Sequence, residues 1–242
     1  MYQTNTVNEY QQGQAQDHSV SREALLRRVL SPSPVFTLHD RDCDERGKVE
    51  QFISEKFRAT YNAGIHEFMP QILSMRCLNA FSGAIGMRKA AGSALFLEQY
   101  LDSSIEASIS RASGVQIARK DIVEIGNLVA GRRGPSQFVF LIASSVLKLA
   151  GYKWITFTAT QSLANNLKKL GFPMVKLADA NVDCLSEEES KEWGSYYDTR
   201  PQVFAGSLGA AAAIARKRPL YRQALALYRR EIKCLAQELR GK

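Results

Sequence analysis

The sequence predicts an α/β fold in which one mixed sheet carries helices packed against it. The main observation is the order strand, helix, strand, helix, strand between residues 121 and 177. This order is typical of domains in which each helix buries an apolar stripe against a sheet. The composition agrees, because 45% of the 242 residues are hydrophobic and 23% are charged, as in a globular domain with a sizeable core.

The first 34 residues are expected to form a flexible arm outside the folded domain. They are rich in Gln, Asn and Thr and offer few apolar anchors. One short helix is predicted from Ser21 to Leu30, because the Ser-Pro-Ser-Pro run that follows cannot continue a helix. We therefore divide the chain into this arm (1–34), a domain at 35–206 and a helical extension at 207–242.

The first half of the domain is expected to combine short strands with two helices. Apolar residues at steps of three and four predict an amphipathic helix. Two later apolar runs, separated by five residues, predict a hairpin with a rather long loop. The segment Leu95–Asp102 fits a strand or a helix. The expected elements are strands at Val35–Leu38, Ile72–Leu78 and Ala84–Arg88, and helices at Gly47–Tyr61 and Ser104–Ser110.

The second half of the domain has clearer boundaries. A Gly-Arg-Arg-Gly turn precedes Pro135, and proline suits the first turn of a helix, where its missing N–H costs nothing. The expected elements are strands at Asp121–Ile125, Tyr152–Thr158 and Met174–Leu177, a helix at Pro135–Ala150, and a helix capped by Ser162 and ended by Gly171.

Residues 208–240 are expected to be helical, with a break near Pro219. Beyond the break, apolar side chains recur every three or four positions and form one seam. We expect this seam to dock on the domain, and a homodimer contact or a membrane surface are the alternatives. The seam consists of Tyr221, Ala224, Leu225, Tyr228, Ile232, Leu235 and Leu239.

The positive charge of the chain is concentrated at this C-terminal end. The net charge is +8, and nine basic against two acidic side chains lie between Arg216 and Lys242. Such a segment attracts an anionic partner, such as an acidic carrier protein, a lipid surface or nucleic acid. A solvated basic helix face explains the same charge without any partner.

Several other classes of protein and of site are not indicated. The chain has no apolar run of 18 residues and no apolar stretch near its N-terminus, so we expect a cytoplasmic protein, with a peripheral contact to the inner membrane as an option. Its four cysteines are scattered, which predicts reduced thiols and no metal site. The three histidines are dispersed, and no Ser-His-Asp order, HExxH or GxxxxGK[ST] motif is present.

The stretch from Glu124 to Gly171 carries the strongest chemical pattern. A strand with a carboxylate leads to a Gly- and Arg-rich turn that opens a helix. Unpaired N–H groups and the helix dipole at such a turn bind phosphate. Arginine side chains add full charge, and glycines allow the anion to approach closely. Each feature alone also fits an ordinary turn, an ion-paired carboxylate or a surface asparagine, so the order of the features carries the hypothesis.

In this order the chain resembles the acyl-donor half of the GCN5-related N-acyltransferase fold. Four stretches also resemble signatures of the thermostable-hemolysin family, over about residues 48–206. That family in turn resembles the acyl-homoserine-lactone synthases. The four stretches are Leu95–Asp102, Ile105-Glu106, Ile122–Leu128 and Trp193–Tyr197.

The resemblance implies a three-layer sandwich with a splayed central sheet, to which a basic C-terminal helix is added. It also implies acyl transfer from acyl-coenzyme A or acyl carrier protein to a small amine, with no tightly bound cofactor. Asn127 stands where the synthases carry arginine, and the tryptophan and paired aspartates that serve S-adenosylmethionine have no clear counterpart. These departures favour an amine acceptor other than that of the lactone synthases.

Roles follow for particular residues. Glu124 is expected to accept a proton from the amine, and a main-chain N–H near Asn127 and Leu128 to stabilise the oxyanion. Arg88 suits an acceptor carboxylate, although a surface ion pair is equally compatible. Glu98 and Tyr100 enter the acceptor pocket by resemblance alone, whereas Trp193, Tyr196 and Tyr197 are expected in the core. The phosphate-binding residues expected are Gly131, Arg132, Arg133, Gly134, Ser136 and Asn165.

Two other functions compete with acyl transfer. A membrane-active, hemolysin-like protein without enzymatic activity has the basic C-terminal helix as its only support. A nucleic-acid-binding module would also use that helix, but the sequence contains no known recognition motif. We therefore expect no nucleic-acid partner.

Overall fold

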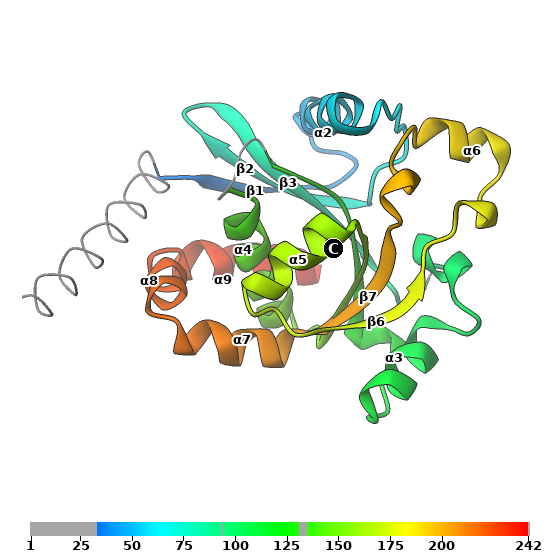
Figure 1. The fold of residues 1–242 in the computed structure, drawn as a ribbon. Helices are drawn as coiled ribbons and strands as arrows, with labels where there is room; N and C mark the ends of the chain where they lie inside the picture. Colours follow the sequence, from blue (N-terminus) through cyan, green and yellow to red (C-terminus); the bar gives the residue numbers. More distant parts are fainter. Residues whose placement is uncertain (1–32, 93, 131–134, 242) are drawn as a thin grey trace, which may run out of the picture.

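The computed structural model describes residues 33–92, 94–130 and 135–241, and Figure 1 shows helices on both faces of a single sheet. The sheet has seven strands in the order β1-β2-β3-β4-β5-β7-β6. Strands β4 and β5 are parallel, and every other neighbouring pair is antiparallel. The strands are β1 (Val35–His39), β2 (Gln71–Cys77), β3 (Ala80–Lys89), β4 (Ile122–Ala130), β5 (Trp154–Ala159), β6 (Met174–Asp179) and β7 (Gln202–Ser207).

The helices make two outer layers, which confirms the mixed α/β prediction. One face of the sheet buries the largest core, against α4, α5, α7, α8 and α9. The other face carries α2 and α3, each over its own smaller core. The helices are α2 (Arg46–Tyr61), α3 (Ile105–Ser113), α4 (Pro135–Ala150), α5 (Gln161–Lys169), α6 (Glu187–Glu192), α7 (Leu208–Lys217), α8 (Pro219–Leu227) and α9 (Arg229–Gly241), with short 3-10 turns at Phe96–Tyr100, Arg119–Asp121, Val182–Cys184 and Tyr197–Thr199.

Most predicted elements are confirmed, and the differences have local causes. The β2–β3 hairpin has a tight turn instead of a long loop, because Leu78 and Asn79 both adopt positive φ (51° and 62°). Helix α5 begins at Gln161, since Thr160 Oγ1 accepts a hydrogen bond from the Leu163 N–H (3.3 Å) and takes the capping place expected of Ser162. Residues 96–100 form a 3-10 helix.

Strand β7 was not predicted, although it separates β5 from β6 in the sheet. Its sequence, Gln-Val-Phe-Ala-Gly-Ser, is six residues long and lacks a clear alternation. Short apolar runs of this kind do not distinguish a strand from a buried turn or helix segment. Only the pairing with β5 and β6 identifies it.

Strands β4 and β5 separate at the middle of the sheet. They pair only from Ile122 with Trp154 to Ile125 with Phe157. Beyond this point β4 continues beside β3 to Ala130, whereas β5 continues beside β7 to Ala159. The sheet is therefore splayed between two strands whose carboxyl ends lie on the same side.

The C-terminal seam docks on the domain, as expected. Tyr228, Ile232, Leu235 and Leu239 are buried in the largest core, where α9 contacts α4 and β1. The Glu231 carboxylate accepts a hydrogen bond from the Phe36 main-chain N–H (2.8 Å) and so pairs α9 with the edge strand β1. No helix in the described part of the chain is long and apolar enough to cross a membrane.

Candidate active site

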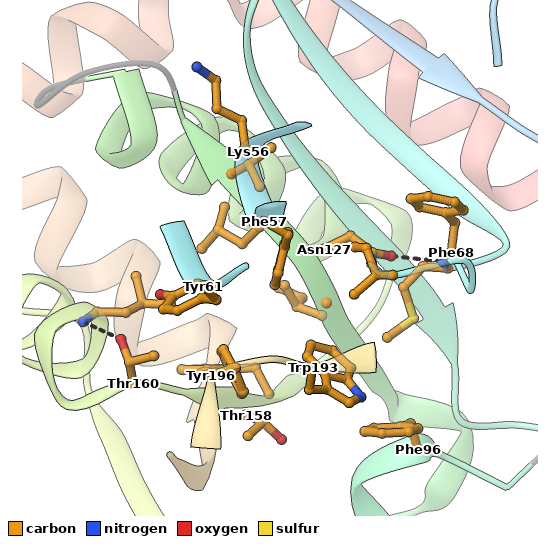
Figure 2. Close-up of a pocket in the computed structure, with 18 of the residues that line it drawn as sticks. Lys56, Phe57, Tyr61, Phe68, Phe96, Asn127, Thr158, Thr160, Trp193 and Tyr196 are labelled. Atoms are coloured by element: carbon orange, nitrogen blue, oxygen red, sulfur yellow. Dashed lines mark hydrogen bonds between the residues drawn. The ribbon is translucent and has the colours of Figure 1, made fainter. Parts of the chain in front are cut away.

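A cavity of about 620 Å³ lies where β4 and β5 separate. Its walls come from α2, from the segment before β2, from β4 and β5, from the start of α5 and from residues 193–197. Figure 2 shows aromatic and polar side chains from these segments pointing toward a common space. Segments far apart in the sequence therefore meet at the splay of the sheet.

Glu124 is the buried carboxylate of this cavity. Its side chain is 3% exposed, and its oxygens accept hydrogen bonds from the main-chain N–H groups of Leu97 (3.0 Å) and Phe96 (3.2 Å). Burial raises the pKa of Glu124, while the two N–H donors and Arg88 oppose that rise. The raised pKa makes this group a better proton acceptor than an exposed glutamate.

Arg88 stands beside Glu124 on the neighbouring strand. The two residues are directly paired in the β3–β4 register, and Arg88 Nη1 lies 3.9 Å from Glu124 Oε2. The separation is long for an ion pair, and the arginine side chain is 24% exposed. Its guanidinium therefore keeps donors available for a ligand in the cavity.

An aromatic wall lines the same cavity, and two of its members, Trp193 and Tyr196, do belong to or pack against a buried core cluster, as expected. Trp193 and Tyr196 lie 5.1 Å apart between ring centroids, and Tyr61 lies 5.2 Å from Tyr196. Phe96 completes the wall at 6.0 Å from Trp193. All four line the cavity, and Trp193 remains partly exposed. The Trp193-Gly-Ser-Tyr-Tyr197 stretch was the signal that could have placed Trp193 and Tyr196 at the cavity.

A bulge in β4 adjoins Glu124. Gly86 pairs with Gly126 and Ala84 pairs with Val129, so Asn127 and Leu128 stand together opposite Ile85. Asn127 has a positive φ of 48°, and its Oδ1 accepts a hydrogen bond from the Met69 N–H (2.8 Å). The side chain of Asn127 thus fixes the bulge to the segment before β2. Leu128 also lines the cavity.

Replacing Asn127 by alanine is expected to lower the free energy of unfolding by about 1–3 kcal/mol. The variant removes the acceptor of the Met69 N–H and places an alanine at positive φ. Asn127→Asp keeps both the acceptor and the tolerance for this conformation, so its loss should stay below about 1 kcal/mol. Urea denaturation measures both, and equal losses would exclude the hydrogen bond as the cause.

The expected phosphate-binding turn falls mostly outside the described residues. Gly131, Arg132, Arg133 and Gly134 lie outside them, and so does the side chain of Ser136 in the first turn of α4. On α5, both Asn165 and Asn166 are exposed; Asn166 lines the cavity, and Asn165 accepts a hydrogen bond from Gln161 (3.1 Å). Phosphate binding by Asn165 stays a prediction, because the turn it would act with lies outside the described residues.

Glu98 and Tyr100 take part in packing and not in the cavity wall. Glu98 forms a bidentate pair with Arg119 (2.6 and 2.7 Å) and accepts hydrogen bonds from the N–H groups of Leu95 and Ile105. The Tyr100 hydroxyl is hydrogen-bonded to that of Tyr197. Glu98 and Tyr100 thus stabilise the 3-10 turn whose N–H groups donate to Glu124, and neither of them lines the cavity.

Glu98 is expected to make the fold sensitive to acid. The hydrogen bond from Arg119 lowers the pKa of Glu98 to about 2. Because the folded-state pKa is below that of an unfolded glutamate, this contribution is complete above about pH 4.5 and is lost as the pH falls toward 2. Glu98→Gln should therefore unfold less steeply with acid than the wild type. Urea titrations between pH 2 and pH 6 would measure it, and parallel curves would contradict the assignment.

Metal chemistry has no support in the described part of the chain. No group of three or more His, Cys, Asp or Glu side chains is arranged there to hold a metal ion.

Several solved structures share this fold. FeeM, an N-acyl amino acid synthase from uncultured soil microbes, is similar over 78% of this chain and 98% of its own, with 13% identity and a TM-score of 0.50. BjaI, a CoA-dependent acyl-homoserine lactone synthase with SAM and isopentyl-CoA, is similar over 79% and 99%, with 7% identity and a TM-score of 0.50. TofI in its apo form is similar over 74% of this chain and 99% of its own, with 10% identity and a TM-score of 0.51. These likenesses confirm the expected fold, which is that of GCN5-related acyltransferases.

Sequence comparison identifies the family. No curated protein matches the chain. The model of the thermostable hemolysin family matches residues 39–212, a span that contains Arg88, Glu124, the β4 bulge and the aromatic wall. Because this span is more than half of the 242 residues, the chain belongs to the thermostable hemolysin family.

Proposed function

We propose that this protein is an N-acyltransferase that moves an acyl group from a thioester to a small amine. The observation that carries the proposal is the buried carboxylate of Glu124 in a cavity at the splay between β4 and β5. A cavity of about 620 Å³ is large enough for the reacting ends of both substrates. The proposed donors are acyl-coenzyme A and acyl carrier protein, in line with the CoA dependence of BjaI, which shares the fold.

In the proposed reaction the amine nitrogen attacks the thioester carbonyl carbon. Glu124 takes the proton that the nitrogen loses, through the lone pairs not engaged by Phe96 and Leu97. The main-chain N–H of Leu128, in the β4 bulge, donates to the oxyanion of the tetrahedral intermediate. The carbon–sulfur bond then breaks, the amide forms, and the thiolate leaves and takes up a proton.

The proposed acceptor is an amine that also carries a carboxylate, such as an amino acid. Arg88 lines the cavity 3.9 Å from Glu124, and its planar fork matches a carboxylate. The aromatic wall of the same cavity would hold an apolar acceptor side chain. FeeM, which shares the fold, is an N-acyl amino acid synthase, and this is consistent with an acceptor of the same class.

Thiol release from acyl-coenzyme A and acyl carrier protein tests the function on the full chain. Release should require both a thioester and an amine acceptor, with amino acids as the preferred acceptors, and mass spectrometry should detect the N-acyl product. Release that does not depend on any of the twenty amino acids, or no release at all from either donor, would contradict the proposal.

The acceptor carboxylate is tested through Arg88. Arg88→Lys keeps the charge but loses the bidentate fork, so the KM for an amino acid should rise about tenfold. The KM for the corresponding decarboxylated amine should change less than about twofold, since it lacks the group that Arg88 binds. Equal changes for the two acceptors would assign Arg88 to the structure of the site instead.

A further inference from the structure

A second cavity, of about 590 Å³, lies on the side of α4 that faces the C-terminal helices. Its walls come from α4, from residues 170–172 that follow α5, from α7, and from α8 and α9. In Figure 1 these C-terminal helices follow one another around α4 on the same side of the sheet. Much of the wall, including Tyr221 and Leu225, lies beyond residue 212, where the family match ends.

The floor of this second cavity is apolar. Phe140 and Phe172 meet edge to face at 4.9 Å between ring centroids, and Leu141, Leu225 and Ile232 surround them. Among the described lining residues, Phe140 is the one that this cavity has in common with the candidate active site. The second cavity is therefore a separate chamber that adjoins the first through one aromatic ring.

The charged residues of the wall have a single sign. Lys148, Arg216 and Arg229 are exposed and come from three different helices. No aspartate or glutamate is present among the described residues of the wall. An apolar floor with only cations around it complements a ligand that has an apolar body and an anionic head.

We infer that this second cavity binds a fatty acid anion. The alkyl chain would lie on Phe140, Phe172 and Leu225, where burial removes apolar surface from water. The carboxylate would be held by Arg216, Arg229 and Lys148, since guanidinium and ammonium groups bind carboxylates by charge-assisted hydrogen bonds. The inference does not depend on acyl transfer at Glu124, because none of the described residues that line this cavity is assigned to that reaction.

Charge reversal on α7 tests the head group. Arg216 lines the cavity and Lys217, its neighbour, does not, while both are exposed and carry the same charge. Calorimetric titration with dodecanoate, below its micelle concentration, should show about fivefold weaker binding to Arg216→Glu. Lys217→Glu should bind within about twofold of the wild type. Dodecylammonium, with the same chain and the opposite head charge, should bind the wild type at least tenfold more weakly than dodecanoate.

Filling the apolar part of the cavity tests the location. Ala212 lines it and Ala213 does not, although both are partly buried on α7. Ala212→Phe should weaken dodecanoate binding about tenfold, and Ala213→Phe should leave it within about twofold. Equal effects of the two glutamate variants, or tight binding of dodecylammonium, would overturn the inference even if a phenylalanine variant failed to fold. Absence of binding to the wild type would overturn it directly, and acyl transfer measured on the same preparation would be judged separately.

Discussion

Replacing Glu124 by glutamine is expected to lower the rate of acyl transfer by about 10²–10⁴-fold, because the amide cannot accept the proton that the amine loses. The wild-type rate should fall as the pH drops through the pKa of Glu124, which burial raises above its usual value. The residual rate of the variant should not show this decrease with falling pH. Single-turnover measurements of thiol release across the pH range, at saturating acceptor, would show both effects.

Glu124→Gln is also expected to lower the stability of the fold, and this effect must be distinguished from the loss of rate. Glu124 accepts main-chain N–H bonds on both of its carboxylate oxygens, from Phe96 and from Leu97. Glutamine offers only one acceptor oxygen, so the N–H of Phe96 or of Leu97 would be left without its partner. We expect a loss of about 1–3 kcal/mol in the free energy of unfolding. Urea denaturation of the variant gives this value and shows whether the protein is folded under the assay conditions.

Glu98→Gln is the matched control for Glu124→Gln. Glu98 also accepts two main-chain N–H bonds, from Leu95 and Ile105, but it does not line the cavity. Its variant should lose comparable stability and keep the rate within about tenfold of the wild type. If both variants lost the rate equally, or if Glu124→Gln kept it, Glu124 would not be the proton acceptor.

The periodicity of the sequence predicted most of the sheet, because the local sequence signals and the tertiary packing favoured the same elements. The helix at Pro135 has a proline in its first turn and an apolar stripe, and the structure places α4 at Pro135–Ala150. The seam of α9 was also read correctly, since its apolar spacing requires a partner surface and the domain supplies one. Strand β7 was missed because its identity depends on pairing with β5 and β6, which no local pattern encodes.

The candidate site was less predictable, because it forms where distant segments meet. Glu124 and Arg88 were identified from their strands, and the β3–β4 register does bring them together. The aromatic wall was not, since the exposure of Trp193 depends on how residues 193–197 pack on the end of α2. Asn127 was predicted from the sequence as a catalytic residue. Its hydrogen bond with the Met69 N–H is a tertiary contact, and only the structure shows it.

Replacing Gly194 by alanine is expected to destabilise the protein by about 2–4 kcal/mol and to displace the aromatic wall. Gly194 has a positive φ of 52°, a backbone conformation that residues other than glycine rarely adopt. A Cβ at this position would also meet the main-chain oxygens of Tyr61 and Asn62, the latter at 2.7 Å. Backbone atoms cannot move aside as a flexible side chain would, so the strain must be relieved by separating residues 193–197 from α2.

That separation should appear in the chemistry as well as in the stability. Trp193 and Tyr196 line the same cavity as Arg88, so the KM for the acceptor should rise more than the KM for the thioester. Ser195→Ala is the matched control, because it removes only the hydrogen bond to the Tyr61 oxygen (3.1 Å) at an exposed position, and we expect it to cost less than about 1 kcal/mol. Near-ultraviolet circular dichroism would follow the packing of the tryptophan. Unchanged acceptor affinity in a destabilised Gly194→Ala would show that the aromatic wall supports the fold without contacting the acceptor.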